Sequence, residues 1–235
     1  MTLYLLPNLL GSNLDHSLFL PISVDHAVST LDGLIAESEG GGRRYLKQFS
    51  TKKKPHEMPI ALLKSSAQKN ELDFLLEPVI NGENWGVVSD CGLPCLADPG
   101  AALVRRARYH NLLVHTFSGP SSITHALVLS GLSGQSFHFH GYLPKEPKER
   151  AKTLKVYEKT LRTTHIFIEA PYRNLHTYQA CLDTLKPTTL LSVATQLTTP
   201  EEWIQTAPIS WWRTQKEISS KIMKKPTIFL FTAEK

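Results

Sequence analysis

Three short segments combine glycine, proline and polar side chains in a way that suits the binding of a small ligand. They are Ser89–Gly100, Ser118–Ser122 and Glu169–Arg173, and each follows an apolar run of strand-like composition. Glycine lets the backbone approach a ligand closely, and ligands of open α/β sheets bind outside the carboxyl ends of the strands. One such segment is typical of an ordinary turn and helix cap, whereas three of them favour a shared pocket.

Each segment also predicts the start of a helix. Asp98 precedes Pro99, and aspartate is a favoured N-cap whereas proline fits just inside the first turn. We therefore expect one helix to begin at Asp98-Pro99, a second to follow Ser122 and a third to begin at Pro171.

Motifs of the commonest α/β enzymes are absent from the sequence. No Gly-x-Gly-x-x-Gly follows the first apolar run, no Gly-Lys-Ser/Thr ends a phosphate loop, and no Gly-x-Ser-x-Gly occurs. These absences exclude an ordinary dinucleotide-binding site, a P-loop nucleotidase and a hydrolase with a serine nucleophile elbow.

The elements that would position these segments alternate in the first half of the chain. Strands are predicted at Leu3–Leu6, Gly33–Ala36, Trp85–Ser89 and Leu112–Phe117, and helices at Val24–Leu31, Arg43–Phe49, Glu71–Ile80 and Ala101–Tyr109. Strand and helix in alternation indicate a parallel α/β sheet. Three successive glycines, Gly40–Gly42, disfavour a helix, so we expect a mobile surface loop there.

Strands lie closer together in the second half. They are predicted at Ser136–Tyr142, His165–Glu169, Leu190–Thr195, Glu202–Thr206 and Thr227–Phe231, with helices at Glu149–Lys159 and Tyr172–Leu185. This pattern indicates a mixed sheet, and a boundary near Val114–Gly119 divides the chain into domains 1–116 and 117–235. His138 and His140 alternate with aromatic residues, which a half-buried strand face explains without metal ligation, so no metal is expected.

Composition limits the class of protein. The 235 residues carry a formal net charge of +5, with 41% hydrophobic and 20% charged residues, which is ordinary for a globular protein and mildly favours a polyanionic partner such as RNA. Three cysteines argue against a disulfide framework, and Cys91 and Cys95 lack a second ligand pair at zinc-finger spacing. Without a signal sequence or a membrane-length apolar run, we expect a cytoplasmic protein with no membrane contact.

Five segments in the same order resemble the tetrapyrrole-methylase superfamily. They are Leu3–Pro7, Ser89–Gly100, Gly119–Ser122, Phe139–Pro144 and Glu169–Arg173. The second is similar to the Ser-Asp-Ala-Gly-x-Pro…Asp-Pro-Gly loop of the ribosomal RNA small subunit methyltransferase I branch, whereas corrin and sirohaem enzymes carry Gly-Gly-Asp-Pro there. The resemblance covers nearly the whole chain.

The resemblance implies an α/β tetrapyrrole-methylase fold, with a parallel-sheet N-terminal domain, a mixed-sheet C-terminal domain and S-adenosylmethionine in the cleft between them, in a homodimer. It assigns the cofactor to the loop after the third predicted strand and to the next loop, with weaker assignments at three other strand ends. The residues are Ser89, Asp90, Cys91, Gly92, Pro94, Leu96, Ser121 and Ser122, and then Pro7, Ala170 and Ala194.

The ribosomal branch methylates a ribose 2′-hydroxyl of a cytidine in small-subunit RNA, so the resemblance implies ribosomal RNA or the small ribosomal subunit as partner. A ribose hydroxyl needs a base, for which Glu37 and Glu169 are candidates. The alternatives are an ion pair of Glu37 with Arg43 or Arg44, and a helix cap or Arg173 pair for Glu169. Candidate phosphate contacts are Arg43, Arg44, Lys52, Lys53, Lys54 and Arg173, and candidate base-stacking residues are Tyr45 and Tyr172.

Departures from the family pattern keep other functions open. Glu37–Gly40 replaces a usual Glu-Asp-Thr-Arg, the first loop at Pro7–Leu14 is longer than usual, and Leu63–Ser66 stands where His-x-His-Asn is usual. These departures fall on the expected substrate side. The alternatives are a methyltransferase acting on a tetrapyrrole or another small molecule, and a catalytically silent RNA-binding relative.

Overall fold

The computed structural model describes residues 1–11 and 14–233, so Ser12 and Asn13 of the long first loop lie outside the described residues. It divides into two compact units, Met1–Ser121 and Ser122–Lys235. The division therefore falls after Ser121, not after residue 116. Within the described part of the chain, no helix is long and apolar enough to span a bilayer.

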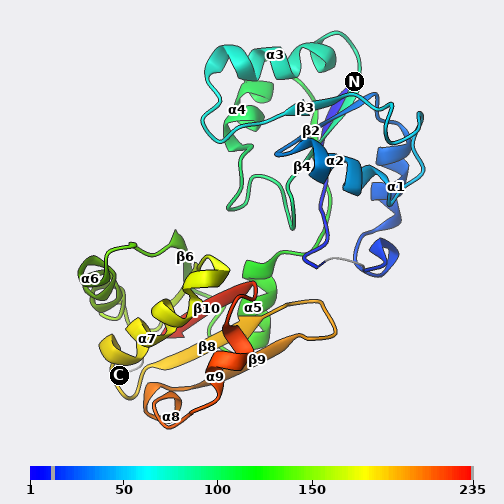
Figure 1. The fold of residues 1–235 in the computed structure, drawn as a ribbon. Coiled ribbons are helices and arrows are strands. Elements are labelled where there is room, and N and C mark those ends of the chain that lie inside the picture. Colours follow the sequence, from blue (N-terminus) through cyan, green and yellow to red (C-terminus); the bar gives the residue numbers. More distant parts are fainter. Residues whose placement is uncertain (12–13, 234–235) are drawn as a thin grey trace. The chain divides into compact units, whose positions relative to one another are not determined.

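The first unit is a parallel sheet of five strands in the order β3-β2-β4-β1-β5 (Figure 1), which confirms the predicted parallel sheet. Its strands are β1 (Thr2–Leu5), β2 (Gly33–Ala36), β3 (Ile60–Leu62), β4 (Asn84–Val88) and β5 (Val114–Thr116). Its helices are η1 (His16–Leu18), α1 (Ile22–Ser29), α2 (Glu39–Leu46), α3 (Lys69–Ile80) and α4 (Ala101–Tyr109).

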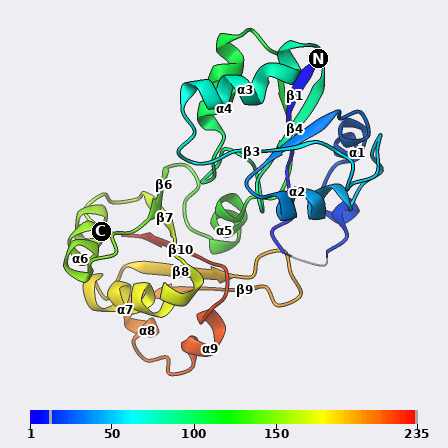
Figure 2. The same ribbon diagram turned by 45° about the horizontal axis from the view of Figure 1, so that its top comes forward.

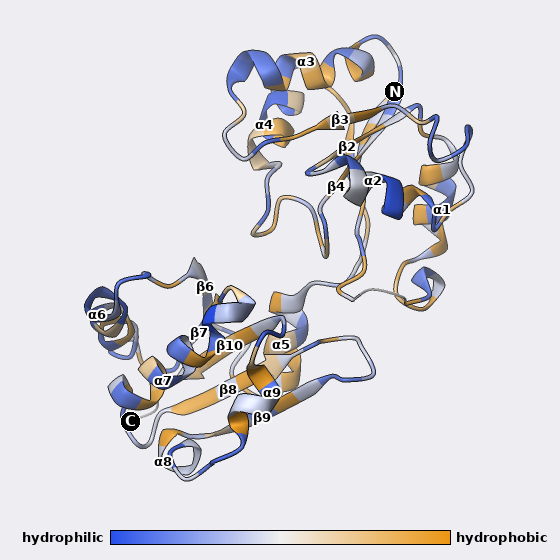
Figure 3. Cartoon of the chain, viewed as in Figure 1, coloured by the Kyte–Doolittle hydropathy of each residue, from blue (hydrophilic) through white to orange (hydrophobic). Residues whose placement is uncertain are grey.

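Helices cover both faces of this sheet. Buried side chains of α1 and α2 join one core, and those of α3 and α4 join another on the opposite face. Hydrophobic and hydrophilic residues alternate along α3 (Figure 3), which matches its buried stripe of Leu72, Leu75, Leu76 and Val79. Because both faces are covered, strands β2 and β4 are apolar along nearly their whole length.

The direction of the connections changes between β2 and β4. From β2 the chain continues to β3, toward one edge of the sheet, and from β4 it continues to β5, at the opposite edge. Such a switch point opens a crevice at the carboxyl ends of the two strands, where ligands of open α/β sheets bind. Glu37 directly follows β2 and Ser89 directly follows β4, so both residues lie at the carboxyl ends of these two strands.

The second unit is a mixed sheet in the order β6-β7-β10-β8-β9, as the sequence predicted. Only β6 and β7 are parallel; the other pairs are antiparallel. The strands are β6 (Phe137–Tyr142), β7 (Thr164–Ile168), β8 (Leu190–Thr195), β9 (Trp203–Pro208) and β10 (Thr227–Thr232).

The helices of this unit are α5 (Ser122–Ser130), α6 (Pro147–Tyr157), η2 (Pro171–Arg173), α7 (Asn174–Thr184), α8 (Ile209–Trp212) and α9 (Ile218–Ile222). Figure 2 shows α5 on one side of the sheet and α7, α8 and α9 on the other. The main core lies on the latter side and includes Phe167, Tyr178, Trp212 and Phe229.

The expected mobile loop at Gly40–Gly42 is wrong, because these glycines lie in the first turns of α2. The Ser38 hydroxyl caps the helix by accepting a hydrogen bond from the Gly41 amide at 3.0 Å. A Cβ added at Gly42 would lie 3.0 Å from Ile60 Cδ1 and 3.2 Å from Ala36 Cβ. Close packing on the sheet thus outweighs the low helix propensity of glycine.

Two further expectations need correction. Helix α4 begins at Ala101 with Gly100 as its N-cap, so Asp98 is not the cap. Gly100 has a φ of 136°, a left-handed conformation that aspartate would not adopt. The three-residue edge strand β3 and the short helices α8 and α9 were not predicted from the sequence.

Candidate functional site

The loops after β1 and β4 are joined by backbone hydrogen bonds. The Asn8 amide donates to the Gly92 carbonyl at 2.8 Å, and the Gly92 amide donates back to the Asn8 carbonyl at 3.1 Å. The Asn8 side chain also donates to the carbonyls of Ser89 and Asp90, at 2.9 Å each. Two loops that are far apart in sequence therefore form one rigid surface at the carboxyl edge of the first sheet.

The loop after β5 packs against the same surface. A Cβ added at Gly119 would lie 2.9 Å from Pro7 Cγ, closer still to Pro7 Cβ, and 3.4 Å from Leu93 Cδ2. Only glycine allows this approach. The loops after β1, β4 and β5 thus meet at Pro7, Gly92 and Gly119, whereas the third segment predicted to share a pocket, Glu169–Arg173, lies in the second unit.

The loop after β4 has an unusual backbone. Cys95 and Ala97 both have a φ of 69°, beside Gly92 at 74°. A left-handed conformation costs a residue with a Cβ about 1–2 kcal/mol, so packing must hold this loop in place. A Cβ at Gly100 would lie 2.5 Å from Cys95 Sγ, which shows how tightly the loop folds on itself. Strained and over-determined loops of this kind are concentrated at functional sites.

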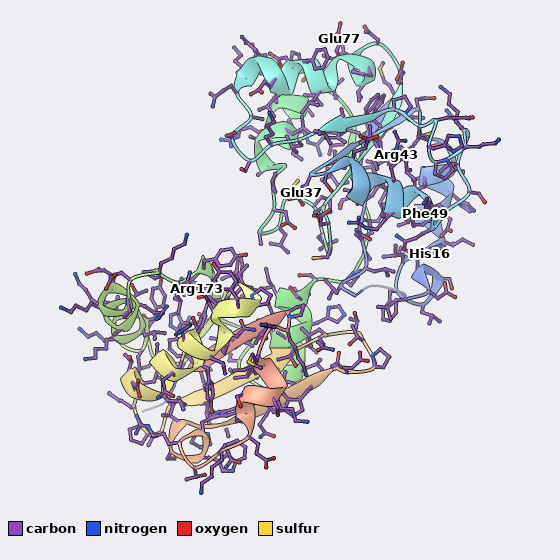
Figure 4. All side chains as sticks on the ribbon, in the orientation of Figure 1. His16, Glu37, Arg43, Phe49, Glu77 and Arg173 are labelled. Carbon is purple, nitrogen blue, oxygen red and sulfur yellow. The ribbon has the colours of Figure 1, made fainter. Side chains whose placement is uncertain are left out.

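Three carboxylates lie near the switch point. Glu37 Oε1 accepts a hydrogen bond from the Asp90 amide at 3.2 Å, and Glu37 points toward the loop after β4 (Figure 4). The pKa of Asp98 is raised to about 6 by burial and by the charges of Glu37 and Asp90, against the opposing effect of a hydrogen bond with Ser89. Asp98 was predicted from the sequence only as a helix cap, and its place beside Glu37 was not predicted.

The thiols of this loop are not activated. Burial, followed by the charge of Asp98, raises the pKa of both Cys91 and Cys95. Both cysteines are free, as is the buried Cys181. Protonated thiols are poor nucleophiles, so Cys91 and Cys95 suit packing against a ligand better than covalent catalysis.

Most of the predicted cofactor residues lie on these three loops of the first unit. They are Pro7, Ser89, Asp90, Cys91, Gly92, Pro94, Leu96 and Ser121, of which all but Asp90, Cys91 and Leu96 are buried. The remaining three lie in the second unit, Ser122 at the start of α5, Ala170 before η2 and Ala194 buried in β8. The cofactor roles of all eleven residues stay predictions.

Glu169 is engaged within the second unit. The Thr177 hydroxyl donates to its Oε2 at 2.8 Å, the Ala170 amide donates to Oε1 at 2.8 Å, and the Arg173 guanidinium lies 3.2 Å from Oε2. The Arg173 contact is the ion pair weighed as an alternative to catalysis, whereas the helix-cap alternative is wrong, because Ala170 and Arg173 are the N-caps of η2 and α7 and neither helix has a side-chain cap. Glu37 differs, because its Oε1 accepts from the Asp90 amide and Arg43, one of the two arginines weighed as its ion-pair partner, pairs with Glu39 instead.

Two of the predicted phosphate-binding residues have other partners in this structure. The Arg43 guanidinium donates to the carbonyls of Pro55 and Met58, at 2.6 Å each, and pairs with Glu39 at 3.2 Å. Lys52 pairs with Asp32 at 2.7 Å. Arg43 thereby fixes the segment before β3.

The other predicted RNA contacts differ in exposure. Arg44, Lys53, Lys54 and Tyr172 are exposed, whereas Arg173 is held by Glu169. Tyr45 is 1% exposed and packs on Phe49 with ring centroids 4.9 Å apart. The base-stacking role considered for Tyr45 is therefore wrong, because its ring belongs to the core.

Comparisons with known proteins agree with this architecture. Residues 24–210 match the family model described as Tetrapyrrole (Corrin/Porphyrin) Methylases. The chain is similar to the ribosomal RNA small subunit methyltransferase I of Vibrio cholerae serotype O1, with 34% identity over 143 residues, 61% of this chain and 49% of that protein. The protein of the same name from Bacillus subtilis (strain 168) is 30% identical over 183 residues, 78% of this chain and 59% of that protein.

Structural similarity extends over the whole chain. A crystal structure of diphthine synthase superimposes with a TM-score of 0.67 at 13% identity, over 99% of this chain and 89% of that one. At this identity the similarity shows the fold alone. The matched regions span about half the length of the curated relatives, 53%, 49% and 52% for the first three.

Proposed function

Because the chain belongs to the tetrapyrrole methylase family, as its motifs predicted, we propose that it transfers a methyl group from S-adenosylmethionine to RNA of the small ribosomal subunit. The observation that carries this proposal is the hydrogen-bonded junction of Asn8 with Gly92, closed by Gly119 against Pro7. It brings together, at one sheet edge, the motifs that resemble the cofactor loops of the family.

The residues present fit the cofactor. Gly92 and Gly119 have no side chain at the points where the loops pack closely together. Ser89, Asp90 and Leu96 border the same surface. These residues, with Pro7, Cys91, Pro94 and Ser121, would hold S-adenosylmethionine in the first unit. Bound there, the cofactor supplies an electrophilic methyl group on a sulfonium sulfur.

The protein's own part in this reaction is alignment and proton removal. Rigid loops hold the reacting groups in line, which accounts for much of the rate that a positioned bimolecular reaction gains. If the acceptor is a ribose 2′-hydroxyl, Glu37 is the base that the geometry favours, since it follows β2 at the switch point, contacts the loop after β4 and lies within electrostatic reach of Asp98. Glu169 would act by positioning Arg173 and the start of α7.

The names of the relatives support an RNA substrate, and the net charge of +5 agrees with a polyanionic partner. We expect phosphate contacts from the exposed Arg44, Lys53 and Lys54. Removing Lys53 and Lys54 together should lower the slope of log affinity against log salt by about 1–2, since each neutralised phosphate contributes about 0.7–0.9. Cytoplasmic location and a homodimer also remain predictions.

Labelled S-adenosylmethionine, incubated with the protein and one acceptor at a time, tests this proposal. The acceptors are small ribosomal subunits, naked small-subunit RNA and a tetrapyrrole. Transfer to either RNA acceptor supports the proposal, and mapping of the product would identify the methylated atom. Transfer to the tetrapyrrole alone would replace the substrate, and cofactor binding without any transfer would indicate a silent relative.

A further inference from the structure

Three histidines gather on one face of the second sheet, away from the motifs described above. His138 and His140 lie on β6, and His165 lies on the parallel neighbour β7, in register with His138. Alternate residues of a strand share a face, as do residues in register on neighbouring strands, so all three imidazoles project to the same side. One ring nitrogen from each residue lies within 4.8 Å of those of the other two.

Two of the rings are held firmly. His140 stacks on Tyr157, with centroids 3.8 Å apart, and its Nε2 lies 2.9 Å from His165 Nδ1. His165 is 1% exposed and stacks on Phe231 with centroids 5.1 Å apart. A rigid ring pair of this kind is a pre-organised part of a ligand set.

His165 presents Nδ1 to the cluster, 2.9 Å from His140 Nε2. Its other nitrogen, Nε2, points away from the cluster and is buried, with the backbone of Tyr157 and Thr160 beside the ring. Packing therefore fixes which nitrogen of His165 faces the other two imidazoles. The short distance between His140 and His165 is satisfied either by one shared proton or by a cation in its place.

We infer that His138, His140 and His165 form a binding site for a divalent transition metal ion, with zinc as the preferred ion. Imidazole nitrogens suit zinc, copper and nickel, whereas magnesium and calcium prefer oxygen ligands. Two imidazoles bound tetrahedrally to zinc place their nitrogens roughly 3.3 Å apart, for Zn–N distances of about 2.0–2.1 Å. His140 and His165 need to separate by a few tenths of an ångström and to turn so that both nitrogens point at the ion, and the exposed His138 can close the set by rotating its side chain.

The site leaves a fourth position to solvent. Three protein ligands with one open position are typical of zinc sites that bind water or an exchangeable ligand. Here the ion would also tie the edge strand β6 to β7. That strand has an irregular register between Phe139 and Tyr142 and a φ of 66° at Gly141, so its pairing is interrupted where the ion would hold it.

The test uses the full chain, freed of metal, in zinc calorimetry and cobalt absorption spectroscopy. His138→Gln removes the exposed ligand without disturbing the core, and His176→Gln, an exposed histidine on α7, is the matched control. We expect one zinc per chain, visible cobalt d–d bands, and affinity at least about tenfold weaker in His138→Gln, with the control unchanged. Zinc should raise the melting temperature of the wild type and of His176→Gln only.

A further variant tests whether zinc binds to the cysteines instead of the histidines. Cys91→Ser/Cys95→Ser removes the thiols of the first unit and should leave zinc binding intact. A thiolate-to-cobalt charge-transfer band, or loss of binding in this double variant, would overturn the proposal. Equal affinity of His138→Gln and His176→Gln, or no zinc binding at all, would overturn it as well.

Discussion

Replacing Gly119 by alanine tests whether the junction of the three loops forms the cofactor surface. The new methyl carbon would lie 2.9 Å from Pro7 Cγ and closer still to Pro7 Cβ. A proline ring cannot rotate out of the way, because its position is fixed by the backbone. The loops after β1 and β5 would therefore have to separate.

Overpacking of this kind costs about 1–3 kcal/mol of unfolding free energy. For a unit the size of Met1–Ser121, each kcal/mol lowers the melting temperature by about 3–5 °C. We expect the melting temperature of Gly119→Ala to fall by roughly 3–15 °C. Because the displaced loops carry the proposed cofactor residues, affinity for S-adenosylhomocysteine should fall about tenfold, which corresponds to about 1.4 kcal/mol.

Calorimetry and thermal denaturation measure both effects, with Gly134→Ala as the matched control. A Cβ at Gly134 would have no neighbour closer than Leu127 Cδ2, at 4.0 Å. Adding Pro7→Gly to Gly119→Ala removes the clashing ring, so the two substitutions should be less than additive in stability. If Gly119→Ala binds the product and melts like the wild type, the loops do not meet as described, and the reasoning fails.

Three further predictions use the same structure. The pKa of Asp98 is raised to about 6 in the folded state, above its ordinary 3.8, so the folded state binds the extra proton and the wild type loses stability as the pH rises from 4 to 6. Asp98→Asn should remove this loss and be about 1 kcal/mol more stable than the wild type at pH 8. Parallel plots of unfolding free energy against pH for the two proteins would contradict this prediction. Arg43→Ala should lose about 2–3 kcal/mol of unfolding free energy, because the Pro55 and Met58 carbonyls lose a charged donor, whereas the exposed Arg44→Ala should stay within about 0.5 kcal/mol in urea denaturation. Glu37→Gln should lower kcat about 10²–10⁴-fold at unchanged cofactor affinity. Glu169→Gln should chiefly lower the melting temperature. If Glu169→Gln lowers kcat and Glu37→Gln lowers only the melting temperature, Glu169 is the base and Glu37 the structural residue.

The architecture could be predicted because strands that are buried on both faces consist of continuous apolar residues, which are visible in the sequence. Leu34 and Ile35 of β2 and Val87 of β4 are buried, and their runs end in the loops that form the site. The edge strand β3 is only three residues long, and its apolar run, Ile60–Leu63, is short. Sequence pattern therefore identified the other strands of this sheet, among them the exposed edge strand β5, and missed this short one.

The site was predicted less completely, because its chemistry depends on residues that only the fold brings together. The pKa of Asp98 depends on Glu37, which follows another strand, and the third imidazole of the histidine cluster comes from β7. The helix at Gly40–Gly42 was missed for the same reason, since its packing partner Ile60 lies on β3. At each of these places, contacts between distant parts of the chain outweigh the local preference of the sequence.

The position of β1 inside the first sheet also constrains synthesis of the protein. The strand nearest the N-terminus pairs with β4, from Asn84, and with β5, up to Thr116. During translation, β1 must therefore remain unpaired until about 80 further residues have been made, and at about 5–20 residues per second this takes roughly 4–16 s. The emerging chain exposes an apolar strand throughout that interval, so early expression yield should depend on chaperone supply more than on the stability of the finished sheet.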